Sequence, residues 1–240
     1  MALEWQVFLQ DDGGGRTYLS WMMDAWGWTL SVAVCSWFVA MLAGTAMGVL
    51  RTLQDSPWLV RLANIWVELF RNIPLLVQIF LWYFVLPKLI PPMQQLPGFV
   101  LVVVALGLFT SARIAEQLRA GIQAMPRGQR YAAMAMGFTT FQTYRYVLLP
   151  MAFRIILPPL TSESMNLLKN SSVAFAVSIA ELTMFAMQAQ EETSRGIEIY
   201  LAVTLLYAVS AFAVNRVMAW VERRVQIPGF IVAGGAGGGH

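Results

Sequence analysis

Three long stretches without a charged residue constrain this chain more than any other feature of its sequence. Residues 25–50 give 26 uncharged positions, residues 89–112 give 24, and residues 199–215 give 17. A helix needs about 20 apolar residues to cross the hydrocarbon core of a bilayer. Apolar residues make up 58% of the chain and charged residues only 12%, which is more apolar surface than a soluble fold of this size could bury. The sequence therefore predicts an all-α, polytopic membrane protein.

Two further candidate spans are interrupted by polar residues. The second carries Pro74, which is expected to kink or interrupt the helix. The fourth carries the charged residues Arg154, Glu163 and Lys169. With these two, about five transmembrane helices are predicted, all in one transmembrane domain that takes in residues 1–240. The predicted spans are about 25–50, 62–86, 98–124, 151–180 and 198–219.

The distribution of basic residues predicts the orientation, because cytoplasmic loops are enriched in Lys and Arg. An external N-terminus and a cytoplasmic C-terminus put nine basic residues inside and three outside. The segments 88–98 and 181–198 are then external loops. The nine inside are Arg51, Arg61, Arg71, Arg127, Arg130, Arg145, Arg154, Arg223 and Arg224, and the three outside are Arg16, Lys88 and Arg195.

Several kinds of function are disfavoured. Cys35 is the single cysteine and His240 the single histidine, so neither a disulfide framework nor a Cys/His metal cluster is expected. The net charge of +3 is scattered, unlike a nucleic-acid-binding patch. The chain has no phosphate-binding G-x-x-x-x-G-K-[ST] motif, no G-x-S-x-G and no H-E-x-x-H. We expect no catalytic residues, no bound metal and no cofactor in this chain.

Charges inside the predicted spans are the strongest functional candidates, because each is costly in lipid. The third span places Thr110, Arg113, Glu116 and Arg119 three residues apart, on one face of the helix. One interpretation is a ladder of ion pairs within the helix, with Glu116 paired to Arg119. The other is that Arg113 grips a carboxylate in a water-filled cavity, since a guanidinium can form two parallel hydrogen bonds to one.

The fourth span is also polar along one face. Glu163, Asn166 and Asn170 share that face, which cannot be exposed to lipid. These residues either line a cavity or form hydrogen bonds between helices. In the first span, Gly44 and Gly48 form a G-x-x-x-G motif that favours close helix packing.

The segment between the third and fourth spans, residues 125–150, is expected to contain a short helix on the cytoplasmic face. Met134, Met136, Phe138 and Phe141 would be exposed on it. Such a helix could contact a partner protein, or it could lie in the lipid headgroups. The residues alone leave both interpretations open.

This segment resembles the EAA loop of ABC importer permeases. That family's pattern is E-A-A, three residues, G, nine residues and I-x-L-P; here Tyr131 replaces the Glu and Val147 the Ile, with the spacing kept. The coupling segment would span about 131–145. The residues that carry the resemblance and would couple to an ATPase are Tyr131, Ala132, Ala133, Gly137 and Pro150.

Other runs are similar to the polar amino acid branch of the family, and closest to its glutamate/aspartate permeases. They are residues 68–78, 110–117, 126–129 and 144–150. Most of that branch has an aromatic residue at the position of Arg113, and an arginine suits an acidic substrate. The resemblance implies that Arg113 holds the substrate's acidic group and that Thr110, Glu163 and Asn166 line the same cavity. Glu163 would also receive the substrate's ammonium group.

The resemblance further implies a multi-pass permease in a bacterial inner membrane. It would pair with a second permease, identical or homologous, and with two ABC ATPase subunits that hydrolyse the ATP. An extracytoplasmic binding protein would deliver glutamate or aspartate. Three alternatives remain open from the sequence: an ABC importer for neutral amino acids such as glutamine, an ion-coupled secondary transporter, and an intramembrane enzyme.

Overall fold

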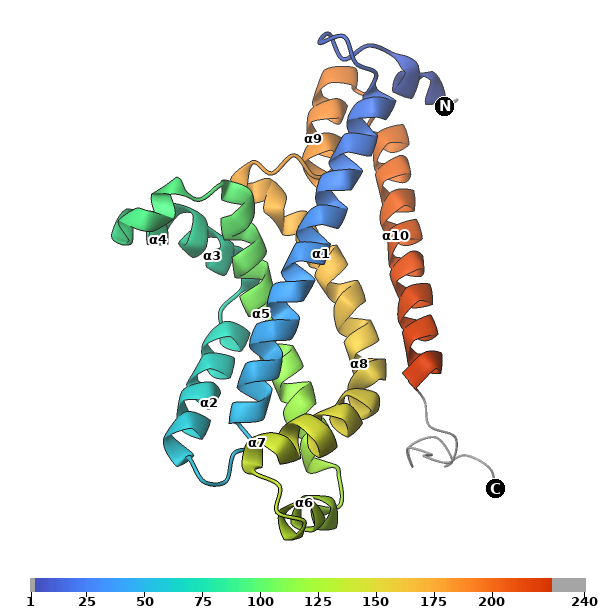
Figure 1. Cartoon of the computed structure of the whole chain (residues 1–240). Coiled ribbons are helices and arrows are strands. Elements are labelled where there is room, and N and C mark those ends of the chain that lie inside the picture. Colours follow the sequence, from blue (N-terminus) through green and yellow to red (C-terminus); the bar gives the residue numbers. More distant parts are fainter. Residues whose placement is uncertain (1–2, 226–240) are drawn as a thin grey trace.

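The computed structural model describes residues 3–225 and confirms the all-helical fold (Figure 1). Within these residues, the β-type pairing is limited to one bridge between Asp11 and Thr17. In chain order the elements are η1 (Trp5–Leu9), α1 (Tyr18–Leu50), α2 (Pro57–Asn72), α3 (Leu75–Phe80), η2 (Leu81–Val85), α4 (Leu86–Leu89), η3 (Pro91–Gln95), α5 (Gly98–Gln123), α6 (Arg127–Ala135), α7 (Thr140–Thr143), η4 (Tyr144–Leu148), α8 (Leu149–Asn170), η5 (Ser171–Val177), α9 (Leu182–Thr193) and α10 (Gly196–Val225).

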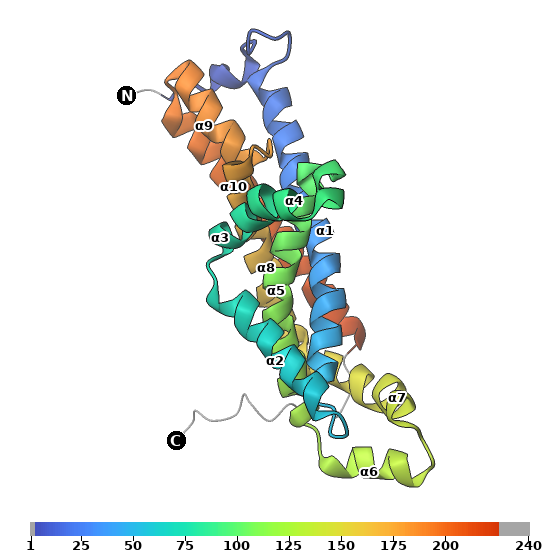
Figure 2. The same cartoon turned by 90° about the vertical axis from the view of Figure 1, so that its left-hand side faces the viewer.

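Among residues 3–225, three helices, α1, α5 and α10, are long and apolar enough to cross a membrane unaided. Two bent pairs bring the number to five if each pair is one span: α2 with α3–α4, bent by 106°, and residues 140–177 with α9, bent by 53°. The 33 residues of α1 extend for about 50 Å, well beyond the hydrocarbon core of a bilayer. One end of the molecule holds α9 and the N-terminal segment, and the other holds α6 and α7 (Figures 1 and 2).

Glycines let α1 and α5 pack at very short range. A Cβ at Gly44 would lie 2.7 Å from the Ile114 Cβ, and one at Gly107 would lie 2.6 Å from the Val39 Cβ. Gly48 meets Leu118 in the same way, at 2.9 Å. Real side chains do not approach so closely, so only glycine fits these positions. The G-x-x-x-G motif of the first span therefore serves helix packing. Close packing matters inside a membrane because lipid supplies no hydrophobic driving force between helices.

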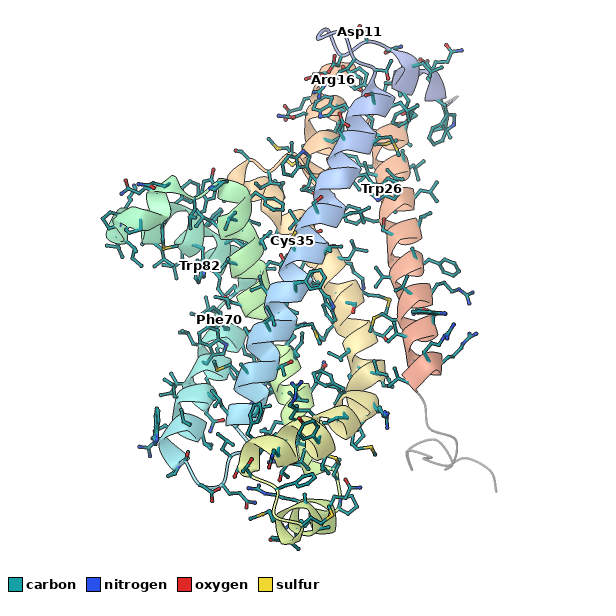
Figure 3. All side chains as sticks on the ribbon, in the orientation of Figure 1. Asp11, Arg16, Trp26, Cys35, Phe70 and Trp82 are labelled. Carbon is teal, nitrogen blue, oxygen red and sulfur yellow. The ribbon has the colours of Figure 1, made fainter. Side chains whose placement is uncertain are left out.

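The second predicted span is broken rather than straight. The helix ends at Asn72 and restarts after Pro74, whose ring cannot continue the hydrogen-bond pattern. Gln78 holds the break, because its amide donates to the carbonyls of Phe70 and Ile73, each at 2.8 Å. Before the break, Phe70 packs with Ala112 and Ala115 of α5 (Figure 3). The sequence predicted the break at Pro74 but gave no sign of Gln78's role.

The segment 181–198, expected as an acidic loop, is mostly helix α9. The segment is helical rather than a loop because Glu181, whose side chain is fully buried, caps the start of α9. Its carboxylate accepts from the backbone N–H of Thr183 at 2.9 Å and of Met184 at 3.0 Å, and from the Tyr207 hydroxyl at 2.9 Å. A capping carboxylate of this kind stabilises a helix start.

The N-terminal segment packs onto the same end of the molecule. Glu4 forms an ion pair with Arg195 at 2.6 Å, and the Tyr18 hydroxyl donates to Glu192 at 2.9 Å. Further along α1, the Trp26 indole donates to the Ser210 hydroxyl of α10 at 2.8 Å (Figure 3). These contacts join α1, α9 and α10 into one unit.

Candidate functional site

An ion pair between α5 and α8 is the centre of the first candidate site. The Arg113 Nη1 lies 3.6 Å from the Glu163 Oε2. The Glu163 side chain is 11% exposed and the Arg113 side chain 42%, so the acid is enclosed while the guanidinium is open to one side. The Arg113 guanidinium also lies 5.2 Å from the centre of the Phe109 ring. The Arg113 guanidinium is thus held in place but retains N–H donors that could bind another anion.

Two more predicted residues belong to the same region. Asn166 forms a side-chain hydrogen bond with the Glu163 carboxylate, one turn further along α8. Thr110 lies one turn before Arg113 on α5 and is buried. The structure therefore brings Arg113, Glu163 and Asn166 into contact. In the described part of the chain no hydrogen bond joins Thr110 to the other three.

The predicted pairing of Glu116 with Arg119 is wrong. The Glu116 carboxylate instead binds Arg71 of α2 at 2.6 Å and lies 3.6 Å from Arg51 at the end of α1. The Arg119 side chain donates to Gln123 at 3.2 Å. Periodicity along one helix cannot reveal partners on neighbouring helices, and here those partners take the carboxylate. Glu116 thereby joins α1, α2 and α5.

The segment predicted to couple to an ATPase forms α6, α7 and η4 at one end of the molecule (Figure 2). Gly137 has a φ of +84°, a conformation that favours glycine, and so turns the chain after α6. Thr139 then starts α7 with a capping box that includes Gln142. Pro150 lies in the first turn of α8, where its missing N–H costs little.

One face of this segment is apolar and exposed. Tyr131 and Ala132 are exposed, whereas Ala133 is buried and holds α6 against the rest of the chain. The exposed fractions are 53% for Met134, 68% for Met136, 36% for Phe138 and 72% for Phe141. Exposed apolar residues gathered in this way are typical of a surface that another molecule covers.

A pair of hydrogen bonds ties this segment to the loop after α1, and the sequence gave no sign of it. The Tyr144 hydroxyl donates to the Thr52 carbonyl at 2.9 Å and lies 2.9 Å from the Thr52 hydroxyl. Residues 92 positions apart in the chain are thereby linked. Tyr144 is buried and Thr52 is half-buried, so the link is partly shielded from water.

The described residues contain no group of three or more Asp, Glu, His or Cys side chains placed to hold a metal ion. The chemistry that the Arg113 site offers is charge recognition. Arg113 and Glu163 present one positive and one negative group, which match the two ends of an amino acid.

The chain is similar over most of its length to known transport proteins. The sequence profile described as "Binding-protein-dependent transport system inner membrane component" matches residues 20–227. The chain is 42% identical to the glutamate/aspartate import permease protein GltJ of Escherichia coli K12, over 95% of this chain and 98% of that protein. It is 36% identical to the probable glutamine ABC transporter permease protein GlnM of Bacillus subtilis, over 86% of this chain and 94% of that protein.

Among solved structures, the chain is similar to one described as an amino acid ABC transporter with histidines. The TM-score is 0.76 and the identity 29%, over 93% of this chain and all of that one. The similarity covers nearly the whole described fold.

Proposed function

The chain belongs to the inner membrane components of binding-protein-dependent transport systems, and from that premise we propose that it is the permease subunit of an ATP-driven importer for glutamate and aspartate. The observation that carries the choice of substrate is the Arg113–Glu163 pair, held between two helices and open on the arginine side. The similarity to GltJ supports the same substrate class.

The proposed substrate contacts follow from charge. Arg113 binds the side-chain carboxylate of the substrate through two parallel hydrogen bonds. Glu163 receives the α-ammonium group, and Asn166, which already contacts Glu163, keeps its carboxylate in place. Thr110 lines the same cavity. Without substrate, Arg113 and Glu163 neutralise each other, which lowers the cost of keeping both charges inside the membrane.

The proposed partners are those of an ABC importer. Two ATPase subunits, which carry the nucleotide sites that this chain lacks, bind the permease pair, and one of them covers the exposed apolar face of α6 and α7 of this chain. A second permease, either a copy or a homologue, completes the translocation path. An extracytoplasmic binding protein delivers the amino acid at the opposite end. The excess of arginine at the α6–α7 end supports a cytoplasmic position for that end in a bacterium, with the N-terminus outside.

The proposed mechanism is a switch between two states. Closure of the ATPases on ATP displaces residues 131–145, and the Tyr144–Thr52 link passes the movement to the end of α1. Because α1 and α5 are packed through their glycines, they move together. That movement separates Arg113 on α5 from Glu163 on α8 and changes access to the substrate. A ligand at one site thus biases a distant site.

Uptake of labelled glutamate into proteoliposomes tests the proposal. The vesicles hold this chain, its permease mate and the ATPase, with binding protein outside and ATP inside. We expect ATP-dependent uptake that excess aspartate blocks and excess glutamine does not. Uptake blocked by glutamine would instead support a neutral amino acid importer, the activity named for GlnM. Uptake insensitive to ATP would contradict the assignment to this transporter class.

The coupling role has its own test. Gly137→Asp introduces a side chain and a charge where φ is +84° and where the ATPase is proposed to bind. We expect ATP hydrolysis without matching uptake, or loss of the ATPase from the purified complex. Gly128→Asp, at a helical position with open space around it, is the matched control. A fully coupled Gly137→Asp variant would refute the coupling assignment.

A further inference from the structure

A cavity of about 660 Å³ lies beside the coupling segment, away from the Arg113 site. Its walls come from the end of α1 and the loop that follows, the end of α5, the start of α6 and part of η4. Its size is within the range of small-molecule sites. Three of the residues that line it are arginines, Arg51, Arg127 and Arg130, and none is acidic.

Arg51 is built into the wall rather than exposed on the surface. Its side chain is only 10% exposed, and its Nε donates to the Asn64 Oδ1 at 2.7 Å, which fixes the guanidinium. Its Nη1 is buried and has no hydrogen-bond partner among residues 3–225. A buried donor without a partner is costly, and a bound acceptor would remove the cost.

The acid nearest to Arg51 does not cancel the positive charge of the cavity. Glu116 lies 3.6 Å from the Arg51 Nη1, but it makes its short contact, 2.6 Å, with Arg71. Glu116 is not part of the lining. Two arginines therefore share one carboxylate, and the charges of Arg127 and Arg130 come in addition. In the described part of the chain neither Arg127 nor Arg130 forms an ion pair.

The start of α6 adds to the positive potential. The helix begins at Arg127, and its N-cap is Pro126, which offers no side-chain acceptor to the free backbone N–H groups. No acidic residue lies in the first turn, and Arg127 and Arg130 lie there instead. Basic residues at this position oppose the helix dipole, which favours anions. An anion in the cavity would meet the unpaired N–H groups and the guanidiniums together.

We propose that this cavity is a binding site for a phosphate group. Guanidiniums match phosphate oxygens through paired hydrogen bonds, and here a buried, fixed arginine is combined with two that are less buried. Tyr131, also in the lining, brings a hydroxyl group. The phosphate belongs either to an anionic lipid headgroup or to a soluble phosphate compound. Tyr131 is part of the proposed coupling segment, so an occupied site bears directly on that segment.

Calorimetric titration of the purified complex of permease subunits and ATPase in detergent tests the proposal at constant ionic strength. The probes are inorganic phosphate, dihexanoyl phosphatidylglycerol below its micelle concentration, and dihexanoyl phosphatidylcholine as a headgroup without net charge. We expect saturable binding of at least one anionic probe and weaker binding of the phosphatidylcholine. Binding of inorganic phosphate identifies a soluble ligand as sufficient, whereas binding of the phosphatidylglycerol alone identifies a headgroup.

Variants locate the binding within the molecule. Arg130→Gln and Arg127→Gln should each weaken binding about tenfold, the effect of one lost charge-assisted hydrogen bond, and Arg130→Lys should weaken it less. Arg61→Gln removes an arginine from α2 outside the lining and should leave the affinity unchanged. Arg51 is left intact because it also binds Asn64. Gel filtration verifies that each complex remains assembled.

Three results would overturn the proposal. The first is that neither phosphate nor phosphatidylglycerol binds saturably. The second is that Arg61→Gln weakens binding as much as the cavity variants, which would indicate general surface attraction. The third is that the cavity variants leave phosphate binding unchanged, whether or not they release the ATPase, since the phosphate would then bind elsewhere, as at the nucleotide sites of the ATPase. None of these results depends on which amino acid is transported, so the substrate proposal is tested separately.

Discussion

At the scale of single residues, the proposed choice of substrate rests on the ion pair between Arg113 and Glu163. The two charges lie 3.6 Å apart on different helices, and the acid is the more enclosed of the two. An arginine that already has a partner still has free donors, because a guanidinium carries five. In the mechanism we propose, an acidic substrate therefore binds before the internal pair separates.

Replacement of Arg113 tests this role. With Arg113→Gln we expect glutamate uptake to fall about 10- to 100-fold, as expected for the loss of charge-assisted hydrogen bonds. Arg113→Lys keeps the positive charge but loses the planar guanidinium. Its uptake rate should therefore lie between those of the wild type and Arg113→Gln. The measurement is the initial uptake rate in proteoliposomes saturated with binding protein. An assembled Arg113→Gln complex with unchanged uptake would show that Arg113 is structural.

The sequence predicted these residues better than it predicted their partners. Arg113, Glu163 and Asn166 stand out because charged and amide side chains are rare in apolar spans. The partner of Glu116 could not be found in the same way, since Arg71 and Arg51 lie on other elements. Helical spacing identifies a shared face, and only the packing of helices shows what meets that face.

At the scale of elements, the contact between α1 and α5 depends on the absence of side chains. Three glycines, Gly44, Gly48 and Gly107, allow backbone and side chains to meet at distances that a Cβ would block. The motif of Gly44 and Gly48 was visible in the sequence. Gly107 was not, because a single glycine in an apolar stretch has no distinctive spacing.

A bulky residue at Gly107 should separate these helices. Gly107→Leu would drive its side chain into Val39 and the carbonyl of Ser36, and we expect a loss of about 1–3 kcal/mol or more in stability. Gly27→Leu is the matched control, since a Cβ at Gly27 meets nothing within 4 Å. Thermal unfolding of the two variants in detergent provides the comparison. Equal unfolding temperatures would contradict the close packing described here.

The breaks between elements were predictable to different degrees. Pro74 marks the break after α2 because proline cannot donate a backbone hydrogen bond. The sequence predicts a loop where α9 begins after its N-cap Glu181, because acidic residues that follow an apolar stretch are usually exposed to solvent. The burial of that carboxylate depends on Tyr207, which is far along the chain.

At the scale of the whole molecule, the Tyr144–Thr52 link connects the coupling segment to the transmembrane helices. The contact crosses from η4 to the loop after α1 and is partly buried. Movement of α6 and α7 can therefore reach α1 without passing through α8. The resemblance to the EAA loop identified the segment but not this connection, because Tyr144 and Thr52 are distant in the chain.

Removal of one hydroxyl tests the connection. Tyr144→Phe deletes the bonds to Thr52 and leaves the ring in place, so we expect assembly to persist while fewer amino acids are transported per ATP hydrolysed. Loss of one to two buried hydrogen bonds corresponds to about 1–3 kcal/mol, enough to lower the ratio several-fold. Tyr146→Phe, at an exposed position, is the control. The idea fails if both variants show the wild-type ratio of transport to hydrolysis.

One of the two Thr52 contacts has an evolutionary consequence. Tyr144 donates to the backbone carbonyl at position 52, and every amino acid provides that carbonyl. This hydrogen bond, and with it the shape of the loop, can therefore be preserved while the side chain at position 52 changes. Among related permeases, the tyrosine hydroxyl should be retained even where position 52 varies, and a search for co-varying pairs of residues would overlook the contact.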